Sequence, residues 1–195
     1  MEIVKHTQPF EYYTVDNFLT FDENCLVYNL CLDSLDVNAY NNKSMFFEYG
    51  EYQNNAGVNT ILPPEIWTKI HNQLLEINDC LSITEQDLNW SFSTNITYDH
   101  KDKPLRPHND DYEKLKQYGA GKIKCLIYLG LNDIDYTDWG TKLYTKADDY
   151  SSFVKEIPFV PGNAFIFTPN STSYHGTEFI NGLSSYRFIL GAEYA

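Results

Sequence analysis

Apolar and polar residues alternate along several short segments in the second half of the chain. The clearest case is 90–98, where Trp90, Phe92 and Ile96 alternate with polar residues, which is the period of a half-buried strand. Further strands are predicted at 11–15, 44–49, 123–129, 142–145, 157–160, 164–168, 173–178 and 186–194. Short strands separated by Gly, Pro and Asn are typical of a sandwich or a barrel.

Two segments of the first half have helical spacing instead. One helix is predicted to open at Phe21, with Asp22 as its N-cap. Its apolar positions are Cys25, Leu26, Leu30 and Leu35. A second helix is predicted to begin at Pro63-Pro64, because proline favours the first helical turn. Its apolar stripe, which we interpret as core, is Ile66, Ile70, Leu74 and Ile77.

Helices followed by a run of strands predict an α+β fold that is mainly β, with the helices packed on one face of the β-core. The length of 195 residues suits a single domain spanning 1–195. Within it, residues 1–88 are expected to form an N-terminal helical support, and 89–195 the core.

Charge and composition exclude several classes of partner. The formal net charge is -13, which argues against nucleic acid and against anionic lipid as partners. A locally basic segment, Lys101 to Lys124, could instead attract an anionic small molecule. The four cysteines include no C-x-x-C pair, so we expect reduced, mostly buried thiols in a soluble, cytoplasmic protein. Residue usage rich in Asn, Tyr, Lys and Ile suggests an AT-rich genome, such as a viral one.

The candidate chemistry lies in His108, Asp110, His175 and Arg187. In extended backbone, His108 and Asp110 project from one face, and His175 on a later strand would complete two imidazoles and one carboxylate. That set leaves metal positions open, as in non-haem Fe(II) oxygenases. Arg187 lies in an apolar strand, where burial would require an anion, and its planar fork suits a carboxylate. Taken alone, the His-x-Asp pair is equally the pattern of a solvated loop.

These residues and their flanking segments resemble the Fe(II)/2-oxoglutarate-dependent dioxygenases, in particular their prolyl-4-hydroxylase-like branch. The resemblance spans residues 90 to 194. Besides the four site residues, the segments that carry it are Leu126-Ile127-Tyr128-Leu129, Gly140-Thr141-Lys142-Leu143 and 158–175, with a looser match at Val15-Asp16-Asn17-Phe18-Leu19.

The resemblance implies a double-stranded β-helix (jelly-roll) core that binds Fe(II) through His108, Asp110 and His175. It implies 2-oxoglutarate as cosubstrate, chelated to the iron and held at its distal carboxylate by Arg187, with O2 as the oxidant. Tyr98 and Tyr128 match positions where the family often places phenols near the cosubstrate, although an inward tyrosine is also ordinary core.

Two departures from the family pattern bear on the site. Thr141 stands where the family often has a second glycine. Ile189 stands where it often has a serine or threonine, so the hydroxyl partner of the distal carboxylate would have to come from elsewhere. The candidates are Ser185, Thr177 or a tyrosine. Segments 44–59 and 132–139, the latter with Trp139, are candidate lids.

The expected activity is hydroxylation of an unactivated C–H of a peptidyl proline or a small metabolite, with release of succinate and CO2. One alternative is a non-catalytic jelly-roll binding or structural protein with a residual metal site. Another is a cupin-type enzyme that works without 2-oxoglutarate. No nucleic acid or membrane partner is expected.

Overall fold

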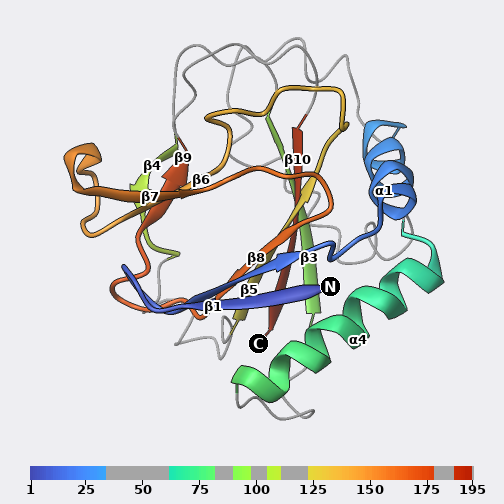
Figure 1. Ribbon diagram of the computed structural model, residues 1–195, viewed down its shortest axis with the longest axis horizontal. Helices are drawn as coiled ribbons and strands as arrows, with labels where there is room; N and C mark the ends of the chain where they lie inside the picture. The colour runs from blue at the N-terminus through green and yellow to red at the C-terminus, as the bar shows by residue number, and fades with distance from the viewer. Residues whose placement is uncertain (34–61, 82–89, 98–104, 111–122, 178–186, 195) are drawn as a thin grey trace.

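The chain is mostly β, in two antiparallel sheets flanked by a few helices (Figure 1). This computed structural model describes residues 1–33, 62–81, 90–97, 105–110, 123–177 and 187–194. The six-stranded sheet has the order β1-β2-β8-β5-β10-β3, and the four-stranded sheet the order β4-β9-β6-β7. The strands are β1 (Glu2–His6), β2 (Tyr12–Asp16), β3 (Trp90–Thr97), β4 (Leu105–His108), β5 (Ile123–Leu129), β6 (Thr141–Tyr144), β7 (Phe153–Ile157), β8 (Ala164–Phe167), β9 (His175–Thr177) and β10 (Arg187–Tyr194).

The six-stranded sheet separates two hydrophobic cores, because successive side chains of a strand point to opposite faces. In β5, Cys125 and Ile127 pack with the helices α1 (Phe21–Asp33) and α4 (Pro64–Leu81). Leu126 and Tyr128 point the other way, toward residues of the four-stranded sheet. The helices therefore cover one face of the large sheet, as expected from the sequence, and the small sheet lies over the other (Figure 1).

Helix α4 has the apolar stripe that its periodicity predicts. Ile70 and Ile77 are fully buried, with Ile66 and Leu74 nearly so. Each such side chain contributes about 1.5–3 kcal/mol by leaving water. The stripe is what holds α4 against the sheet, because the opposite side of the helix carries polar and charged residues. Neither helix of the described residues is long and apolar enough to cross a membrane.

Helix α1 begins at Phe21, as predicted, but its N-cap residue and its buried face differ from the prediction. Its cap is Thr20, whose N–H donates to Glu23 Oε2 at 2.7 Å and whose hydroxyl accepts from the Glu23 N–H at 3.4 Å. This is a capping box, so the assignment of Asp22 as N-cap is wrong. The buried face also differs, since Leu26 is exposed and Asn24 is buried. The Asn24 amide donates to the Gly130 carbonyl at 2.8 Å, and this hydrogen bond holds the Asn24 side of α1 toward the sheet.

Strands 90–97, 123–129, 141–144, 164–167 and 187–194 lie within a residue of their predicted bounds. The strand predicted at 157–160 is wrong: β7 ends at Ile157, because Pro158 and Pro161 flank the next segment and proline cannot donate to a ladder. Strand β9 begins at His175 rather than at 173, because Ser173 closes a turn with Asn170. The predicted strand 44–49 lies outside the described residues.

Candidate metal centre

Three side chains from two neighbouring strands meet at one end of the four-stranded sheet. His108 ends β4, Asp110 follows two residues later, and His175 begins β9. The two strands pair with His108 opposite His175, so the imidazoles are cross-strand neighbours with ring centroids 4.6 Å apart. One ligand atom from each of the three residues lies within 4.8 Å of the other two. Ligand atoms bound at about 2 Å to one ion lie about 3–4 Å apart.

Local structure holds each histidine in place. The register of β4 shifts between Leu105 and His108, a type of irregularity that re-aims side chains next to active sites. The Pro107 carbonyl between them accepts from the Asp148 N–H at 2.8 Å, which ties β4 to the β6–β7 hairpin. On the other strand, Ser173 Oγ accepts from the Asn170 N–H at 2.9 Å and closes the turn just before His175.

Both imidazoles are held by the same kind of hydrogen bond. His108 Nδ1 lies 2.9 Å from the Arg106 carbonyl, and His175 Nδ1 lies 3.0 Å from the Ser173 carbonyl. A carbonyl oxygen can only accept, so in the neutral form of each ring Nδ1 carries the proton and Nε2 carries a lone pair. The Nε2 atoms face Asp110, at 3.8 Å from Oδ1 for His108 and 3.6 Å from Oδ2 for His175. This backbone support of the second ring nitrogen is typical of metal-ligating histidines.

The two oxygens of Asp110 have different surroundings. Oδ1 accepts from Lys124 Nζ, on β5, at 2.9 Å. Oδ2 is buried and has no hydrogen-bond partner among the described residues. A buried carboxylate oxygen without a donor is costly, and its imidazole neighbour offers a lone pair rather than a proton. The donor set of two lone pairs and one unmet anionic oxygen fits a divalent cation.

Protonation states at neutral pH suit ligation. Burial raises the pKa of the Asp110 carboxyl, but nearby positive charge outweighs it and brings the pKa to about 2. Burial lowers the pKa of His175 to about 4, against the opposing effect of Asp110. Since His175 is then uncharged at pH 7, Lys124 is the cation that keeps Asp110 ionised there. A neutral imidazole and an ionised carboxylate are the forms that bind a metal.

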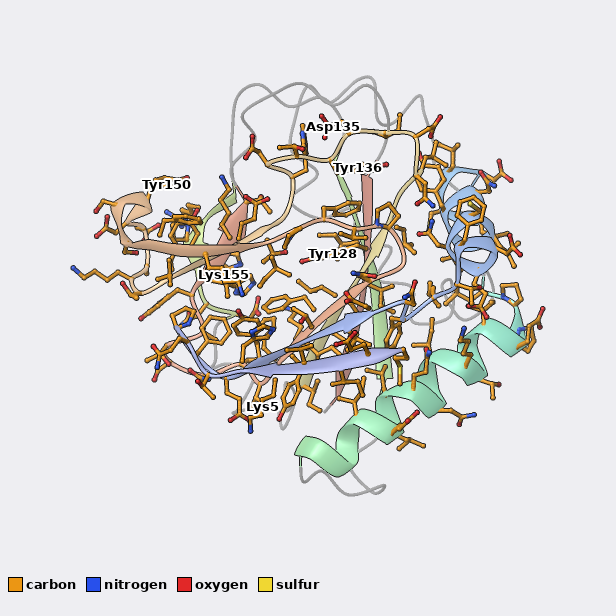
Figure 2. The ribbon with its side chains drawn as sticks, in the orientation of Figure 1. Lys5, Tyr128, Asp135, Tyr136, Tyr150 and Lys155 are labelled. Carbon is orange, nitrogen blue, oxygen red and sulfur yellow. The ribbon has the colours of Figure 1, made fainter. Side chains whose placement is uncertain are left out.

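Further inside, between the two sheets, two hydroxyls face each other. Tyr128 lies in the interior (Figure 2), and its hydroxyl donates to Thr141 Oγ1 at 2.7 Å. Both side chains are buried. Leu143 pairs with His175, and Thr141 lies two residues along β6 from Leu143, which is about 7 Å. A molecule a few carbon atoms long would span this distance between the hydroxyl pair and the candidate metal ligands.

Comparison with known proteins supports the fold. A prolyl-4-hydroxylase from Pseudomonas putida superposes with a TM-score of 0.55 at 14% sequence identity, covering 94% of this chain and 86% of that one. The fold resembles that of a prolyl-4-hydroxylase. No protein-family model matches the chain, and no curated protein matches its sequence. At this identity the likeness concerns the fold alone, and the chemistry rests on the residues of the site.

Other predicted residues have different outcomes. Arg187 begins β10 opposite Thr97, and its side chain lies outside the described part of the chain, as does the whole of Tyr98. The candidate lid segment 44–59 is also outside it. Trp139 is 1% exposed and packs in the core between the sheets, and the lid role of segment 132–139 stays a prediction. Of the cysteines that the structure describes, Cys31 and Cys125 are buried and Cys25 half-buried, all as free thiols.

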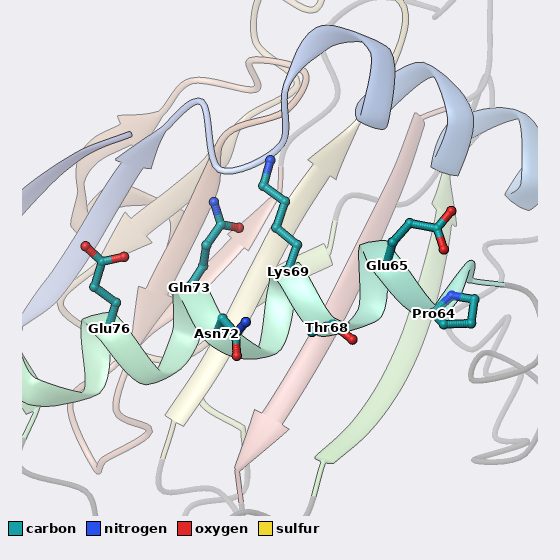
Figure 3. A pocket seen from close by; sticks show the side chains of 7 residues that line it. All are labelled: Pro64, Glu65, Thr68, Lys69, Asn72, Gln73 and Glu76. Carbon is teal, nitrogen blue, oxygen red and sulfur yellow. The ribbon is translucent and has the colours of Figure 1, made fainter.

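Lys124 is the site residue that sequence reasoning missed, because it ends the locally basic segment Lys101 to Lys124 and shares the charge of that segment. The signal was available: a lysine inside an otherwise apolar strand is as costly to bury as Arg187 and needs an anionic partner just as much. The groove in Figure 3, about 690 Å³, is lined by α4 from Pro64 to Glu76, where Lys69 forms an ion pair with Glu23. It lies on the helical layer, across the six-stranded sheet from Asp110.

Proposed function

We propose that the chain is an Fe(II)- and 2-oxoglutarate-dependent dioxygenase that hydroxylates an unactivated C–H of a small molecule or a peptidyl proline, releasing succinate and CO2. One observation carries the proposal: one ligand atom from each of His108, Asp110 and His175 lies within 4.8 Å of the other two, and Asp110 Oδ2 has no hydrogen-bond partner among the described residues. Two histidines and one carboxylate on one face are the ligand set of non-haem Fe(II) oxygenases.

The path of the chain supports a double-stranded β-helix within a single domain. From β3 to β10 the strands fall in the large sheet, the small, the large, the small twice, the large, the small and the large. Repeated crossing between two antiparallel sheets is the kind of connectivity that a jelly-roll requires, so this order supports the proposal. Strands β4 and β9, which carry the candidate ligands, pair within it.

In this proposal the three ligands have distinct tasks. His108 and His175 would hold ferrous iron through Nε2, each fixed in orientation by the backbone carbonyl at its Nδ1. Asp110 would supply the single anionic ligand. When bound, the iron and 2-oxoglutarate supply the O2 chemistry. The residues of the chain contribute the orientation of the ligands and the exclusion of water by the apolar wall around them, which includes Phe167 at 5.0 Å from the His175 ring.

The distal end of 2-oxoglutarate would lie between the two sheets. Position 187 is two residues before Ile189, whose side chain belongs to the inter-sheet core, so strand alternation puts both positions on one face of β10. Arg187 would bind the distal carboxylate from there. Ile189 brings no hydroxyl. We assign that part to the Tyr128–Thr141 pair, since Ile189 and Tyr128 are register partners. Tyr98, directly after β3, is a further candidate phenol.

The test is succinate release by purified protein supplied with Fe(II), 2-oxoglutarate and O2. The proposal expects turnover of 2-oxoglutarate that disappears in His108→Ala and in Arg187→Ala. Metal binding without any effect of 2-oxoglutarate would favour the non-catalytic jelly-roll protein instead. Oxidase activity that survives Arg187→Ala would favour a cupin-type enzyme.

A further inference from the structure

Lys124 is a lysine in an otherwise apolar strand that reaches into the candidate metal centre. Its neighbours Ile123 and Cys125 face the helical layer, so Lys124 projects to the opposite side, between the sheets. There its Nζ lies 2.9 Å from Asp110 Oδ1, and the two side chains are 20% and 11% exposed. A close, largely buried pair of this kind fixes geometry more than it adds stability, because desolvation offsets much of the attraction.

The pair is one-sided. Lys124 contacts Oδ1, whereas Oδ2 keeps no hydrogen-bond partner in the described structure and lies 3.6 Å from His175 Nε2. If the ion pair served only to neutralise Asp110, Lys124 could contact either carboxylate oxygen equally well. Here the lysine contacts Oδ1 at 2.9 Å, where His108 Nε2 lies farther away at 3.8 Å, and it leaves Oδ2 facing the imidazole of His175.

We propose that Lys124 is a positioning residue that reserves Asp110 Oδ1, so that the carboxylate ligates the metal through Oδ2 alone. The inference rests on the proposed function to the extent that a metal binds at His108, Asp110 and His175. Ligation through one oxygen leaves three positions of an octahedral ion open, whereas ligation through both leaves two. Two open positions are filled by a chelating 2-oxo acid, which leaves none for O2.

The positive charge of Lys124 favours the binding of a chelating anion, as ligation of the metal through one Asp110 oxygen also does. The ammonium group competes with the ion for electron density on Asp110, and it makes the metal-loaded site more favourable for an anion. Removal of Lys124 should therefore leave metal affinity equal or higher, while chelating anions bind more weakly. A residue with a merely structural role would have the opposite signature, because a loosened site loses the metal first.

The experiment uses the full chain and two separate titrations. Mn(II) affinity is measured by electron paramagnetic resonance, and oxalate affinity for the Mn(II)-loaded protein by calorimetry. Oxalate chelates the metal but is too short to reach the distal end of the site. In Lys124→Met we expect Mn(II) to bind at least as tightly as in the wild type and oxalate to bind about tenfold more weakly. Lys124→Arg, which keeps a charged donor, should restore oxalate affinity to within about threefold of wild type.

The control is Lys155→Met, which removes the same charge from an exposed position on β7 (Figure 2) and should change neither titration. The inference is overturned if Lys124→Met lowers Mn(II) affinity, or if it leaves oxalate affinity unchanged. If the wild-type protein binds no Mn(II) at all, the failure belongs to the proposed function rather than to Lys124. Thermal unfolding of each variant shows that the comparison is between folded proteins.

Discussion

His175 makes the stability of the metal-free protein depend on pH. Burial holds the pKa of His175 at about 4, against 6.5 for an exposed histidine. Between these two values the unfolded chain binds a proton that the folded chain does not. Stability therefore rises with pH through this window and falls on acidification. The contribution of His175 is complete above pH 6.5 and lost as the pH falls toward 4.

The size of the effect follows from the two pKa values. Integration of the linkage relation from pH 7 to pH 5 gives a loss of about 2 kcal/mol from His175 alone. That is a large fraction of the 5–15 kcal/mol by which typical domains are stable. Asp110 adds little over this range, because its pKa of about 2 keeps it ionised.

The assay is urea unfolding of the chelator-treated protein at pH 7 and pH 5, for the wild type and for His175→Asn. The difference in unfolding free energy between the two pH values should be about 2 kcal/mol smaller in the variant, because asparagine does not titrate. His6 also has a pKa lowered by burial, but it is present in both proteins and cancels. Equal pH dependence in the two proteins would refute the inference that His175 is buried and neutral.

Three further predictions concern the core, the cosubstrate site and a buried thiol. Ile70→Ala should lower the unfolding free energy by about 2–5 kcal/mol, because Ile70 is fully buried on the apolar stripe of α4. Leu26→Ala, at an exposed position, should change it by less than about 0.5 kcal/mol, and urea titration checks both. Thr141→Val should weaken 2-oxoglutarate binding to the Mn(II)-loaded protein about fivefold to tenfold and leave oxalate binding unchanged, since it removes one hydroxyl about 7 Å along β6 from Leu143, the strand partner of His175. Calorimetry would contradict this if both ligands weakened equally. Cys125 should remain unmodified by a thiol reagent in the folded protein, because burial raises its pKa and shields it, and mass spectrometry of the labelled peptide would show a contradiction directly.

Regular periodicity made part of the fold predictable from the sequence. Helix α4 has one dominant apolar stripe, so its buried residues follow from spacing alone, and β5, which is apolar apart from Lys124, has the predicted bounds. Helix α1 could not be predicted in the same way. Its orientation depends on the bond from Asn24 to the carbonyl of Gly130, more than one hundred residues away, and no local pattern encodes that bond.

Some residues of the candidate site could likewise be predicted from the sequence, whereas another could not. His108, Asp110 and His175 could be named because few tasks bring these residue types together at this spacing, and the structure places them side by side. The role of Lys124 could not be read from its basic neighbours along the chain. It depends on the packing of the two sheets against each other, which brings Lys124 of β5 to Asp110 just after β4, and no local sequence pattern shows that packing.

A crystal structure of the protein soaked with Mn(II) and 2-oxoglutarate tests the central claim most directly. The account predicts one anomalous peak about 2.0–2.2 Å from Nε2 of both His108 and His175 and from Oδ2 of Asp110, with 2-oxoglutarate chelated to the ion and its distal carboxylate directed toward Arg187. A metal bound elsewhere, or density for 2-oxoglutarate away from these three residues, would contradict it.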